Sequence, residues 1–385
     1  MRGGIAFFIV LFLAGYAALQ WYIGWHGLLF FQALLPELVS DSSTAYWSLF
    51  WLLALSFLIG RAFLQIGGGG IISRALLRIG AYWLAAMQFL VVLLPIADVI
   101  ALGLMLSGMD VNVLWLGSAV LAVLALLFIR GIRNATSPVV RRYEVTVAKK
   151  TDTPNVDSFR VVLASDLHLG WLVGTKRLRQ LVETINAENP DVVVLTGDII
   201  DDDMRPFLKH RMGDQLRGIS SRWGVYAVTG NHDPLFGEIG DRFSEELSRA
   251  GITLLRDESV HVGDVFWLVG RQDRSLKRFG MKRRPLVELL EEVETTKPVL
   301  LMDHQPYGLE KAEAAGVDVM LSGHTHRGQL APNHWLTRRM FELDWGVVSR
   351  NGFHAVVSSG FGTWGPPVRL GSRCELVELT VRLEK

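Results

Sequence analysis

The sequence predicts an α-helical membrane domain of about four transmembrane helices, followed by a layered α/β domain. Three observations indicate this fold class: charged residues are concentrated in the C-terminal two thirds, the first third holds long apolar stretches, and the remainder alternates short apolar runs with amphipathic segments. We place the membrane domain at residues 1–130 and the α/β domain at 157–385. Residues 131–156 are expected to form a basic juxtamembrane linker.

The charge distribution excludes several classes of protein. The 385 residues include 39 Lys+Arg and 38 Asp+Glu, but only nine of these lie in residues 1–130, which leaves 34 of each sign in 131–385. A third this poor in charge cannot form the surface of a soluble domain, and the remainder is long enough to bury a core. Its balanced charge argues against nucleic acid as a partner. The single cysteine, Cys374, excludes an internal disulfide and a cysteine-rich zinc site.

Four stretches reach the length of about 20 apolar residues that a transmembrane helix needs. They are Gly4–Trp25, Tyr46–Gln65, Ile79–Leu106 and Val113–Phe128. We interpret the first as a retained helix and not a signal peptide, because no small-residue cleavage site ends it. Pro95 and Asp98 interrupt the third, so its span is expected to end early. Asp98 is expected at the membrane interface; a buried carboxylate would instead indicate transport.

The loops between these stretches predict the orientation. Glu37 and Asp41 are the only charged residues between the first two stretches, whereas basic residues lie near the end of the second stretch (Arg61) and between the second and third (Arg74 and Arg78). Six basic residues follow the fourth stretch: Arg130, Arg133, Arg141, Arg142, Lys149 and Lys150. Positive loops stay in the cytoplasm, so both termini and the α/β domain are expected on the cytoplasmic side of the cell (inner) membrane. The basic run would hold that domain against anionic membrane lipids. We predict no protein partner.

From about residue 159 the sequence changes to short apolar runs rich in β-branched residues. The expected strands are Phe159–Ala164, Val192–Thr196, Val225–Thr229, Val265–Val269, Val299–Met302, Val317–Leu321, Ala355–Ser358 and Glu375–Leu383. The expected helices are Lys176–Glu188, Asp241–Ala250 and Arg284–Glu294. This alternation predicts a layered domain in which helices cover a sheet.

Polar side chains follow five of these strands directly. The segments are Ser165-Asp166-Leu167-His168, Gly197-Asp198, Gly230-Asn231-His232-Asp233, Asp303-His304 and Gly323-His324-Thr325-His326. Because ligands bind at the carboxyl ends of strands in open α/β sheets, we expect these side chains to meet in one crevice.

The side chains at these strand ends have the chemistry of a metal site. Four imidazoles, two carboxylates and one carboxamide are enough to hold two divalent ions that share one carboxylate. Mixed nitrogen and oxygen ligands suit Mn²⁺, our first expectation, or Fe, Zn or Co, better than Ca²⁺ or Mg²⁺. Two such ions, about 3.5–4 Å apart, can hold a bridging hydroxide for in-line attack on a phosphoryl group.

The ordered set of motifs resembles the calcineurin-like metallophosphoesterases. The family pattern of Asp-x-His, Gly-Asp, Gly-Asn-His-Asp/Glu, a lone His and Gly-His-x-His is complete here, over about residues 157–385. The resemblance implies an αββα sandwich and a metal-dependent phosphoric ester or pyrophosphate hydrolase. It also implies the ligands: Asp166, His168 and His326 for one metal, Asn231, His304 and His324 for the other, and Asp198 as the bridge.

Two further roles come from the same resemblance. His232 matches a histidine that is not a ligand and that protonates the leaving group or stabilises the transition state, and Asp201 matches a carboxylate that orients it. Arg327 follows the last ligand, where the family often has glycine, and either reaches a substrate phosphate or pairs with an acid. Each motif alone is weak, since Asn and Asp are common in ordinary turns, but five in order indicate a site. We expect His26, His210, His261, His334 and His354 to be structural or solvated.

Apolar and basic residues near the motifs suggest an amphiphilic substrate. The apolar ones are Trp171, Trp335, Leu336, Phe341, Trp345, Phe361 and Trp364, and segment 204–212 adds basic side chains. Multi-pass members of the family resemble hydrolases of UDP-2,3-diacylglucosamine in lipid A synthesis and other membrane phosphodiesterases. We therefore expect a lipid-linked substrate, cleaved to a lipid 1-phosphate and UMP. The alternatives are a phosphodiesterase or phosphatase for other substrates, and an inactive membrane scaffold or sensor.

Overall fold

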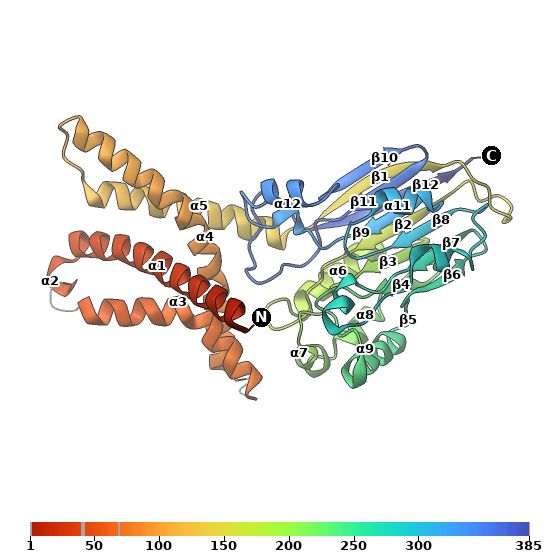
Figure 1. The fold of residues 1–385 in the computed structure, drawn as a ribbon, viewed down its shortest axis with the longest axis horizontal. Helices are drawn as coiled ribbons and strands as arrows, with labels where there is room; N and C mark the ends of the chain where they lie inside the picture. Colours follow the sequence, from red (N-terminus) through yellow and green to blue (C-terminus); the bar gives the residue numbers. More distant parts are fainter. Residues whose placement is uncertain (1, 40–42, 68–69, 385) are drawn as a thin grey trace. The chain divides into compact units, whose positions relative to one another are not determined.

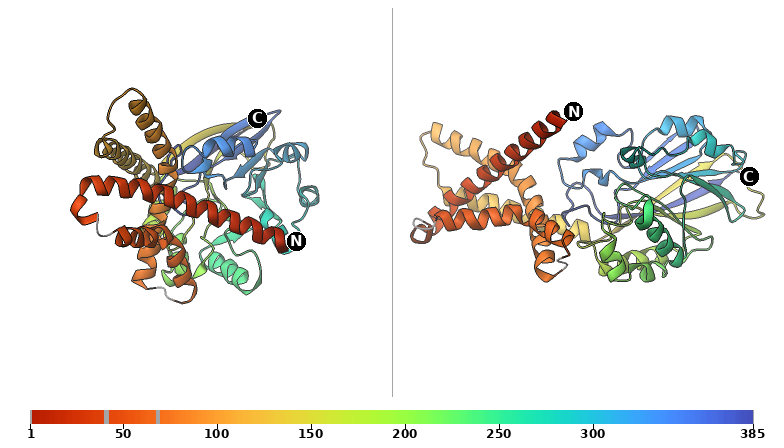
Figure 2. Two further views of the ribbon diagram at one scale, coloured as in Figure 1. Left: turned by 60° about the vertical axis from the view of Figure 1, so that its left-hand side comes forward. Right: turned by 60° about the horizontal axis from the view of Figure 1, so that its bottom comes forward.

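The computed structural model describes residues 2–39, 43–67 and 70–384, and divides the chain into two compact units, residues 1–130 and 131–385 (Figures 1 and 2). The first unit is helical and the second is built on two β-sheets. Each unit has hydrophobic clusters of its own, which agrees with two separate cores.

The first unit contains long helices of membrane-spanning character. Its helices are α1 (Arg2–Leu34), α2 (Pro36–Val39), α3 (Ser43–Gln65), α4 (Ile71–Leu106) and α5 (Val113–Thr136), whose last six residues belong to the second unit. Four segments are long and apolar enough to cross a membrane: Phe7–Leu34, Ser43–Gln65, Ile71–Leu106 and Val113–Thr136. The expectation that the third span ends early is wrong, because α4 continues through Pro95. A proline removes one backbone hydrogen bond, and contacts with neighbouring helices compensate for it in membrane proteins.

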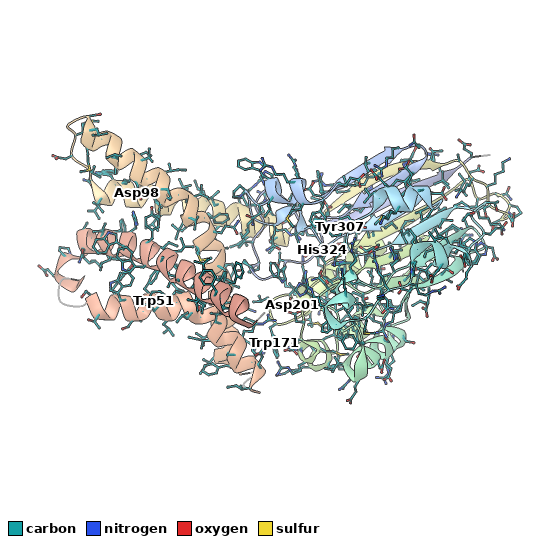
Figure 3. All side chains as sticks on the ribbon, viewed as in Figure 1. Trp51, Asp98, Trp171, Asp201, Tyr307 and His324 are labelled. Carbon is teal, nitrogen blue, oxygen red and sulfur yellow. The ribbon has the colours of Figure 1, made fainter. Side chains whose placement is uncertain are left out.

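Close helix packing and polar contacts between helices hold the helical unit together, as Gly80 and Asp98 illustrate. A Cβ atom on Gly80 of α4 would lie 2.1 Å from the backbone nitrogen of Phe57 in α3, so only glycine permits this approach. The carboxylate of Asp98 in α4 accepts a hydrogen bond from the Tyr22 hydroxyl of α1, and its Oδ1 lies 2.8 Å from Nε2 of His26 (Figure 3 labels Asp98). Asp98 therefore connects α4 to α1.

Two six-stranded sheets form the centre of the second unit. The first has the order β1 (Val139–Val147), β12 (Glu375–Leu383), β2 (Ser158–Ala164), β3 (Val192–Thr196), β4 (Val225–Val228) and β5 (Ile252–Leu254). The second has the order β10 (Gly346–Arg350), β11 (Phe353–Val357), β9 (Val319–Ser322), β8 (Val299–Met302), β7 (Phe266–Gly270) and β6 (Glu258–Val262). Strands β2 to β5 are parallel to one another, as are β7, β8, β9 and β11.

Helices cover the outer faces of both sheets. Helices α6 (Thr175–Ala187), α7 (Met204–Lys209), α8 (Met212–Leu216) and α9 (Gly237–Arg249) supply side chains to the hydrophobic cluster on the outer face of the first sheet. Helices α10 (Leu286–Leu290) and α11 (Leu309–Ala314) do the same for the second sheet. The remaining short helices are α12 (His334–Met340), η1 (Arg274–Phe279) and η2 (His326–Gly328). Between the sheets, side chains such as Leu163 and Leu300 form a dry central core. The αββα sandwich is confirmed.

Central strands were the easiest elements to predict. Strands β3, β8 and β12 have the expected bounds. For β3 and β8 the reason is that a strand buried on both faces is a nearly continuous apolar run. The segment expected as a basic linker instead contains the last turns of α5 and strand β1. In β1, exposed residues such as Arg142 and Glu144 alternate with inward-facing ones such as the buried Val145 and Val147. The charged residues of this edge strand made the segment resemble a linker in the sequence. Helix α10 is shorter than the expected Arg284–Glu294.

Candidate metal centre

The five motifs lie at the carboxyl ends of five parallel strands. Asp166 and His168 follow β2, Asp198 follows β3, and Asn231 follows β4 of the first sheet. His304 follows β8, and His324 and His326 follow β9 of the second sheet. The two sheets therefore deliver their polar side chains to a common edge, on which His324 and Asp201 are labelled in Figure 3.

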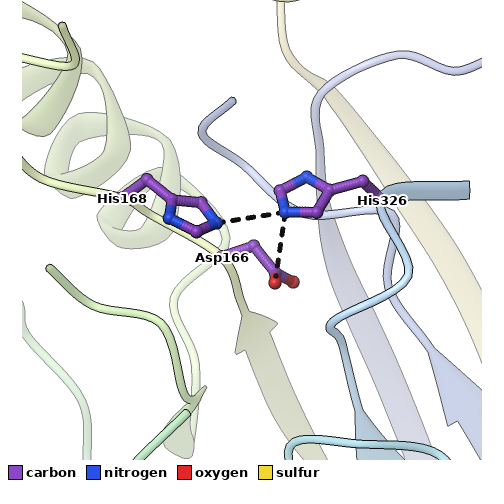
Figure 4. Close-up of side chains that lie close together, drawn as sticks. All are labelled: Asp166, His168 and His326. Carbon is purple, nitrogen blue, oxygen red and sulfur yellow. Dashed lines mark hydrogen bonds and ion pairs between the residues drawn. The ribbon is translucent and has the colours of Figure 1, made fainter. Parts of the chain in front are cut away.

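The first cluster consists of Asp166, His168 and His326 (Figure 4). Nε2 of His168 lies 3.1 Å from Nε2 of His326, and the latter atom lies 3.5 Å from Oδ1 of Asp166. All three residues are buried. Two imidazole nitrogens and a carboxylate oxygen that converge on one buried point form a natural site for a divalent cation.

The second cluster contains Asp198, His304 and His324, with Asn231 beside it. Nε2 of His304 lies 3.2 Å from Oδ2 of Asp198 and 3.3 Å from Oδ1 of Asn231. Nδ1 of His304 donates to the carbonyl of Thr196 at 2.8 Å, and this bond turns Nε2 toward the cluster as the ring nitrogen available to a metal.

Asp198 lies between the two clusters. Its Oδ2 is 3.2 Å from Nε2 of His304 in the second cluster and 3.8 Å from Nε2 of His168 in the first. Its Oδ1 accepts a hydrogen bond of 2.9 Å from the backbone nitrogen of His232. This carboxylate is thus fixed where one residue can serve both clusters.

The electrostatics of the clusters favour bound cations. Burial opposes the ionisation of Asp198, but the charges of His304, His168 and His232 outweigh burial and hold its pKa below the usual range. Burial, followed by the charge of His304, lowers the pKa of His324 to about 4. Nδ1 of His168 is buried and has no hydrogen-bond partner among the described residues. An ionised Asp198 beside the uncharged imidazole of His324 and the unpartnered nitrogen of His168 is a donor set that fits divalent metal ions.

The backbone is strained where the clusters form. Asp166, His168, Asp198, His324 and His326 all have positive φ values, between 47° and 72°. Such values are uncommon for residues other than glycine, and they cluster at functional sites. The strained turns redirect the chain after each strand, so that consecutive polar side chains reach the same crevice.

Two positions beside the ligands require glycine, because ligand carboxylates approach their backbone closely. A Cβ atom on Gly230 would lie 2.1 Å from Oδ1 of Asp198, and one on Gly323 would lie 2.4 Å from Oδ2 of Asp166. The glycines of the Gly-Asn-His-Asp and Gly-His-x-His motifs therefore make room for the carboxylates that follow β3 and β2.

His232 has a different carboxylate partner from the one expected. Its Nδ1 lies 2.7 Å from Oδ1 of Asp202, whereas Oδ1 of Asp201 lies 3.6 Å from Nδ1 of His168. Asp202, with φ of 58°, turns toward His232, and its backbone nitrogen donates to the His232 carbonyl at 3.2 Å. Asp201 therefore faces a residue of the first cluster, and Asp202 is the carboxylate that is hydrogen-bonded to His232.

Two further residues of the site were not identified from the sequence. Asp233 accepts hydrogen bonds from the backbone nitrogens of Ile200 at 2.9 Å and Gly230 at 2.8 Å, and thereby joins the second and third motifs. Arg369 is fully buried, and its Nη2 lies 3.1 Å from Nδ1 of His326. Asp233 is the last residue of a recognised motif, but no local pattern marks Arg369.

The apolar side chains near the motifs divide into buried and exposed groups. Phe341 and Phe361 are buried, whereas Trp335, Leu336 and Trp364 are exposed. The ring centroid of Trp364 lies 5.9 Å from that of His232. The guanidinium of Arg327 lies 4.0 Å from the centre of the Trp345 ring, so it stacks on an aromatic side chain.

The fold and these clusters define a metal-dependent phosphoester hydrolase. A family model described as calcineurin-like phosphoesterase matches residues 159–328. A relative from Aquifex aeolicus, called an uncharacterized metallophosphoesterase, is 32% identical over 246 residues, 63% of this chain and 91% of the relative. The chain belongs to the calcineurin-like metallophosphoesterases, a family that depends on two metal ions.

Other similar proteins include membrane proteins. A transmembrane protein with metallophosphoesterase domain from Danio rerio is 32% identical over 275 residues, 68% of this chain and 62% of that relative. A solved dimetal phosphatase from Danio rerio covers 52% of this chain and 87% of its own, at 15% identity and a TM-score of 0.34. The family assignment rests on the sequence relatives. With its four membrane-capable helices, this chain is a membrane protein.

Proposed function

We propose that this chain is a binuclear phosphohydrolase anchored in the cell (inner) membrane, with its catalytic domain on the cytoplasmic side. The supporting observation is that five motifs from two sheets converge on two buried clusters that share Asp198. The cytoplasmic orientation is supported by the basic residues of the loops on that side.

The ligand roles follow the grouping of side chains. Asp166, His168 and His326 would hold one ion, and Asn231, His304 and His324 would hold the other. Asp198 would bind both. These mixed nitrogen and oxygen donors suit Mn²⁺, our first candidate, and also Fe, Zn or Co. When bound, two such cations lower the pKa of water and offset the charge that develops on a phosphoryl group.

His232 would handle the proton of the leaving group. Because its Nδ1 is held by Asp202 at 2.7 Å, the opposite ring nitrogen, Nε2, is the atom that can give a proton to the leaving oxygen. Burial opposes its protonation, but the hydrogen bond to Asp202 and the charge of Asp198 outweigh burial and raise its pKa to about 9. The protonated, oriented form of the imidazole is therefore favoured.

The first candidate substrate is UDP-2,3-diacylglucosamine, a lipid-linked pyrophosphate. Membrane helices in the same chain keep the domain near lipid, and Trp364, which is 56% exposed beside His232, offers apolar surface at the site. In the reaction, the oxygen of water bonds to one phosphorus and the bridging P–O bond breaks. The leaving phosphate takes a proton from His232, and the products are a lipid 1-phosphate and UMP.

A second candidate is a broad phosphodiesterase or phosphatase that acts on small substrates. It is favoured because both clusters and His232 would act on a phosphoryl group whatever ester group it carries. A third reading, an inactive membrane scaffold or sensor, is opposed by the complete set of ligand residues.

An assay of the purified full chain separates these candidates. The protein is incubated with Mn²⁺ and with UDP-2,3-diacylglucosamine in mixed micelles, bis-p-nitrophenyl phosphate or cyclic nucleotides, beside the Asn231→Ala variant. We expect hydrolysis of the lipid by the native chain, with loss of about 10²-fold or more in the variant, since one ion loses a ligand. Cleavage of the small diesters alone would refute the lipid substrate. No cleavage of any substrate by the native chain would refute the hydrolase.

A further inference from the structure

Helix α12 presents large apolar and basic side chains to the outside of the catalytic domain. Trp335, Leu336 and Met340 are 65%, 60% and 55% exposed. Arg338 and Arg339 are also exposed, and neither has an ion pair within the part of the chain that the structure describes. Isolated exposed apolar residues are ordinary on a protein surface, but three within six positions beside two unpaired cations are not.

The opposite face of α12 is fixed to the domain. The Thr337 hydroxyl donates to Oδ2 of Asp344 at 2.8 Å, and the helix ends at the buried Phe341, whose ring centroid lies 5.9 Å from that of His324. The orientation of α12 is therefore set by packing, and its apolar and basic face must point outward.

The position of α12 is tied to the end of the membrane helix α5. The backbone nitrogen of Arg369 donates to the carbonyl of Gly131 at 3.0 Å, and Nδ2 of Asn134 donates to the carbonyl of Arg369 at 3.1 Å. The neighbouring Leu370 accepts a hydrogen bond of 2.7 Å from the backbone nitrogen of Ala331, three residues before α12 begins. One short segment, 369–370, thus binds both the last turns of α5 and the approach to α12.

The length of α5 indicates the level of those last turns. Its 24 residues, Val113–Thr136, extend about 36 Å at about 1.5 Å per residue, against a hydrocarbon thickness of about 30 Å. The last turns of α5 therefore leave the bilayer at the level of the lipid headgroups. Any element held beside these turns is held near that level.

We infer that α12 is an interfacial docking helix for the surface of the membrane that the chain spans. Trp335, Leu336 and Met340 enter the boundary between headgroups and acyl chains, and Arg338 and Arg339 pair with anionic headgroups. Tryptophan is enriched at this level of a membrane, and the two cations complement the negative surface of the cytoplasmic leaflet.

The docking has a consequence for the metal centre that rests on the proposed lipid substrate. Phe341 follows α12 directly and packs against His324, so a docked α12 keeps the clusters within a few side chains of the headgroup layer. The phosphoester of a membrane lipid then reaches the site without leaving the bilayer. The docking itself does not depend on which substrate is hydrolysed.

Depth measurements on the full chain test the docking. Leu336→Cys, Met340→Cys and Asp264→Cys variants carry a fluorophore, and the chain without an added cysteine is the blank because Cys374 is buried. Asp264 lies in the turn before β7, at the opposite end of the parallel strands from the clusters. Each labelled protein is reconstituted in nanodiscs of phosphatidylcholine with phosphatidylglycerol, with or without lipid that carries a nitroxide near the headgroup.

We expect nitroxide lipid to quench the labels at positions 336 and 340 at least about twofold more than the label at 264, since interfacial helices lie within about 5–10 Å of the boundary. The Arg338→Glu/Arg339→Glu double variant should reduce this quenching, and pure phosphatidylcholine should reduce it in the native sequence. Equal quenching at 336, 340 and 264 would overturn the inference. Since quenching needs no turnover, a failed lipid assay and a failed docking test are distinguishable, and the metal content of each variant confirms that its site is folded.

Discussion

Nη2 of the Arg369 guanidinium lies 3.1 Å from Nδ1 of the His326 ring, and Arg369 is fully buried. The same guanidinium donates to the carbonyl of Gly362 at 2.8 Å, and the backbone of Arg369 bonds to the last turns of α5. A single buried residue thus connects the end of a membrane helix, through its backbone, to a metal-site histidine, through its side chain. Burial favours the uncharged form and lowers the pKa of Arg369.

Removal of this guanidinium should loosen the first cluster. We expect Arg369→Met to cost about 1–3 kcal/mol of unfolding free energy, because the Gly362 carbonyl loses its buried donor, and to weaken metal binding about 10–100-fold. Denaturant unfolding and metal titration measure the two effects. Arg382→Met is the control, since its pair with Glu144 lies at the surface, where water and salt screen it. Equal effects of both substitutions would argue against a special role for Arg369.

Asp202 contacts His232 and Asp201 faces His168, so substitution of these two neighbouring residues should have different effects. Asp202→Asn should slow cleavage of diesters with poor leaving groups by about 10–10³-fold and spare those with good ones, because only a poor leaving group needs the proton. Asp201→Asn should instead weaken metal binding, because Asp201 faces His168. Rates for a series of aryl diesters, taken at several Mn²⁺ concentrations, separate the two. A leaving-group dependence in Asp201→Asn alone would reverse the assignment.

Gly230 should tolerate no side chain. Gly230→Ala places a Cβ atom 2.1 Å from Oδ1 of Asp198, so the carboxylate must move and the shared ligand position is lost. We expect activity to fall about 10²-fold or more. Gly174→Ala is a matched control, because a Cβ atom there meets nothing within 4 Å and its φ is negative. Hydrolysis of bis-p-nitrophenyl phosphate measures both; an active Gly230→Ala variant would contradict the close approach.

Metal removal should destabilise the catalytic domain. Chelation leaves the buried Asp166 and Asp198 carboxylates without cations. A metal ion present at about a hundred times its Kd stabilises the folded state by about 2.7 kcal/mol, and this unfolding free energy is lost for each ion removed. Loss of both ions, about 5.4 kcal/mol in total, should lower the Tm of a unit of this size by about 10–20 °C, and added Mn²⁺ should restore it. Calorimetry of the full chain, with Asp198→Ala as a variant that cannot respond, checks the effect. A Tm that does not change on chelation would count against bound cations.

The polar link in the membrane unit should matter for packing and not for hydrolysis. Asp98→Ala removes the acceptor for Tyr22 and the partner of His26, and hydrogen bonds within membranes are worth about 0.6–1.7 kcal/mol each. We expect lower thermal stability of the membrane unit and unchanged hydrolysis of a soluble diester. An ion or proton flux that the native chain carries in reconstituted vesicles and that Asp98→Ala abolishes would instead indicate a role of Asp98 in transport.

The strand-end motifs needed no structure to be recognised. Each motif follows a strand that is buried on both faces, and such strands are continuous apolar runs whose ends are marked by the first polar residues, as at Asp198 after β3. The four membrane helices follow from the same logic, since length and apolar composition alone satisfy the bilayer. Local composition and order along the chain therefore determined the two domains, the fold of the second, and the candidate ligands.

Other features depended on the path of the backbone in three dimensions. Asp201 and Asp202 are adjacent and chemically identical, and only the positive φ of Asp202 decides which of them reaches His232. Arg369 lies 43 positions from His326, and no periodicity connects them. Strand β1 looked like a basic linker because its outer face is charged, and it became a strand only by pairing with β12. These features arise from contacts between distant segments, and such contacts exist only once the sheets have formed, whereas the motifs are properties of the chain itself.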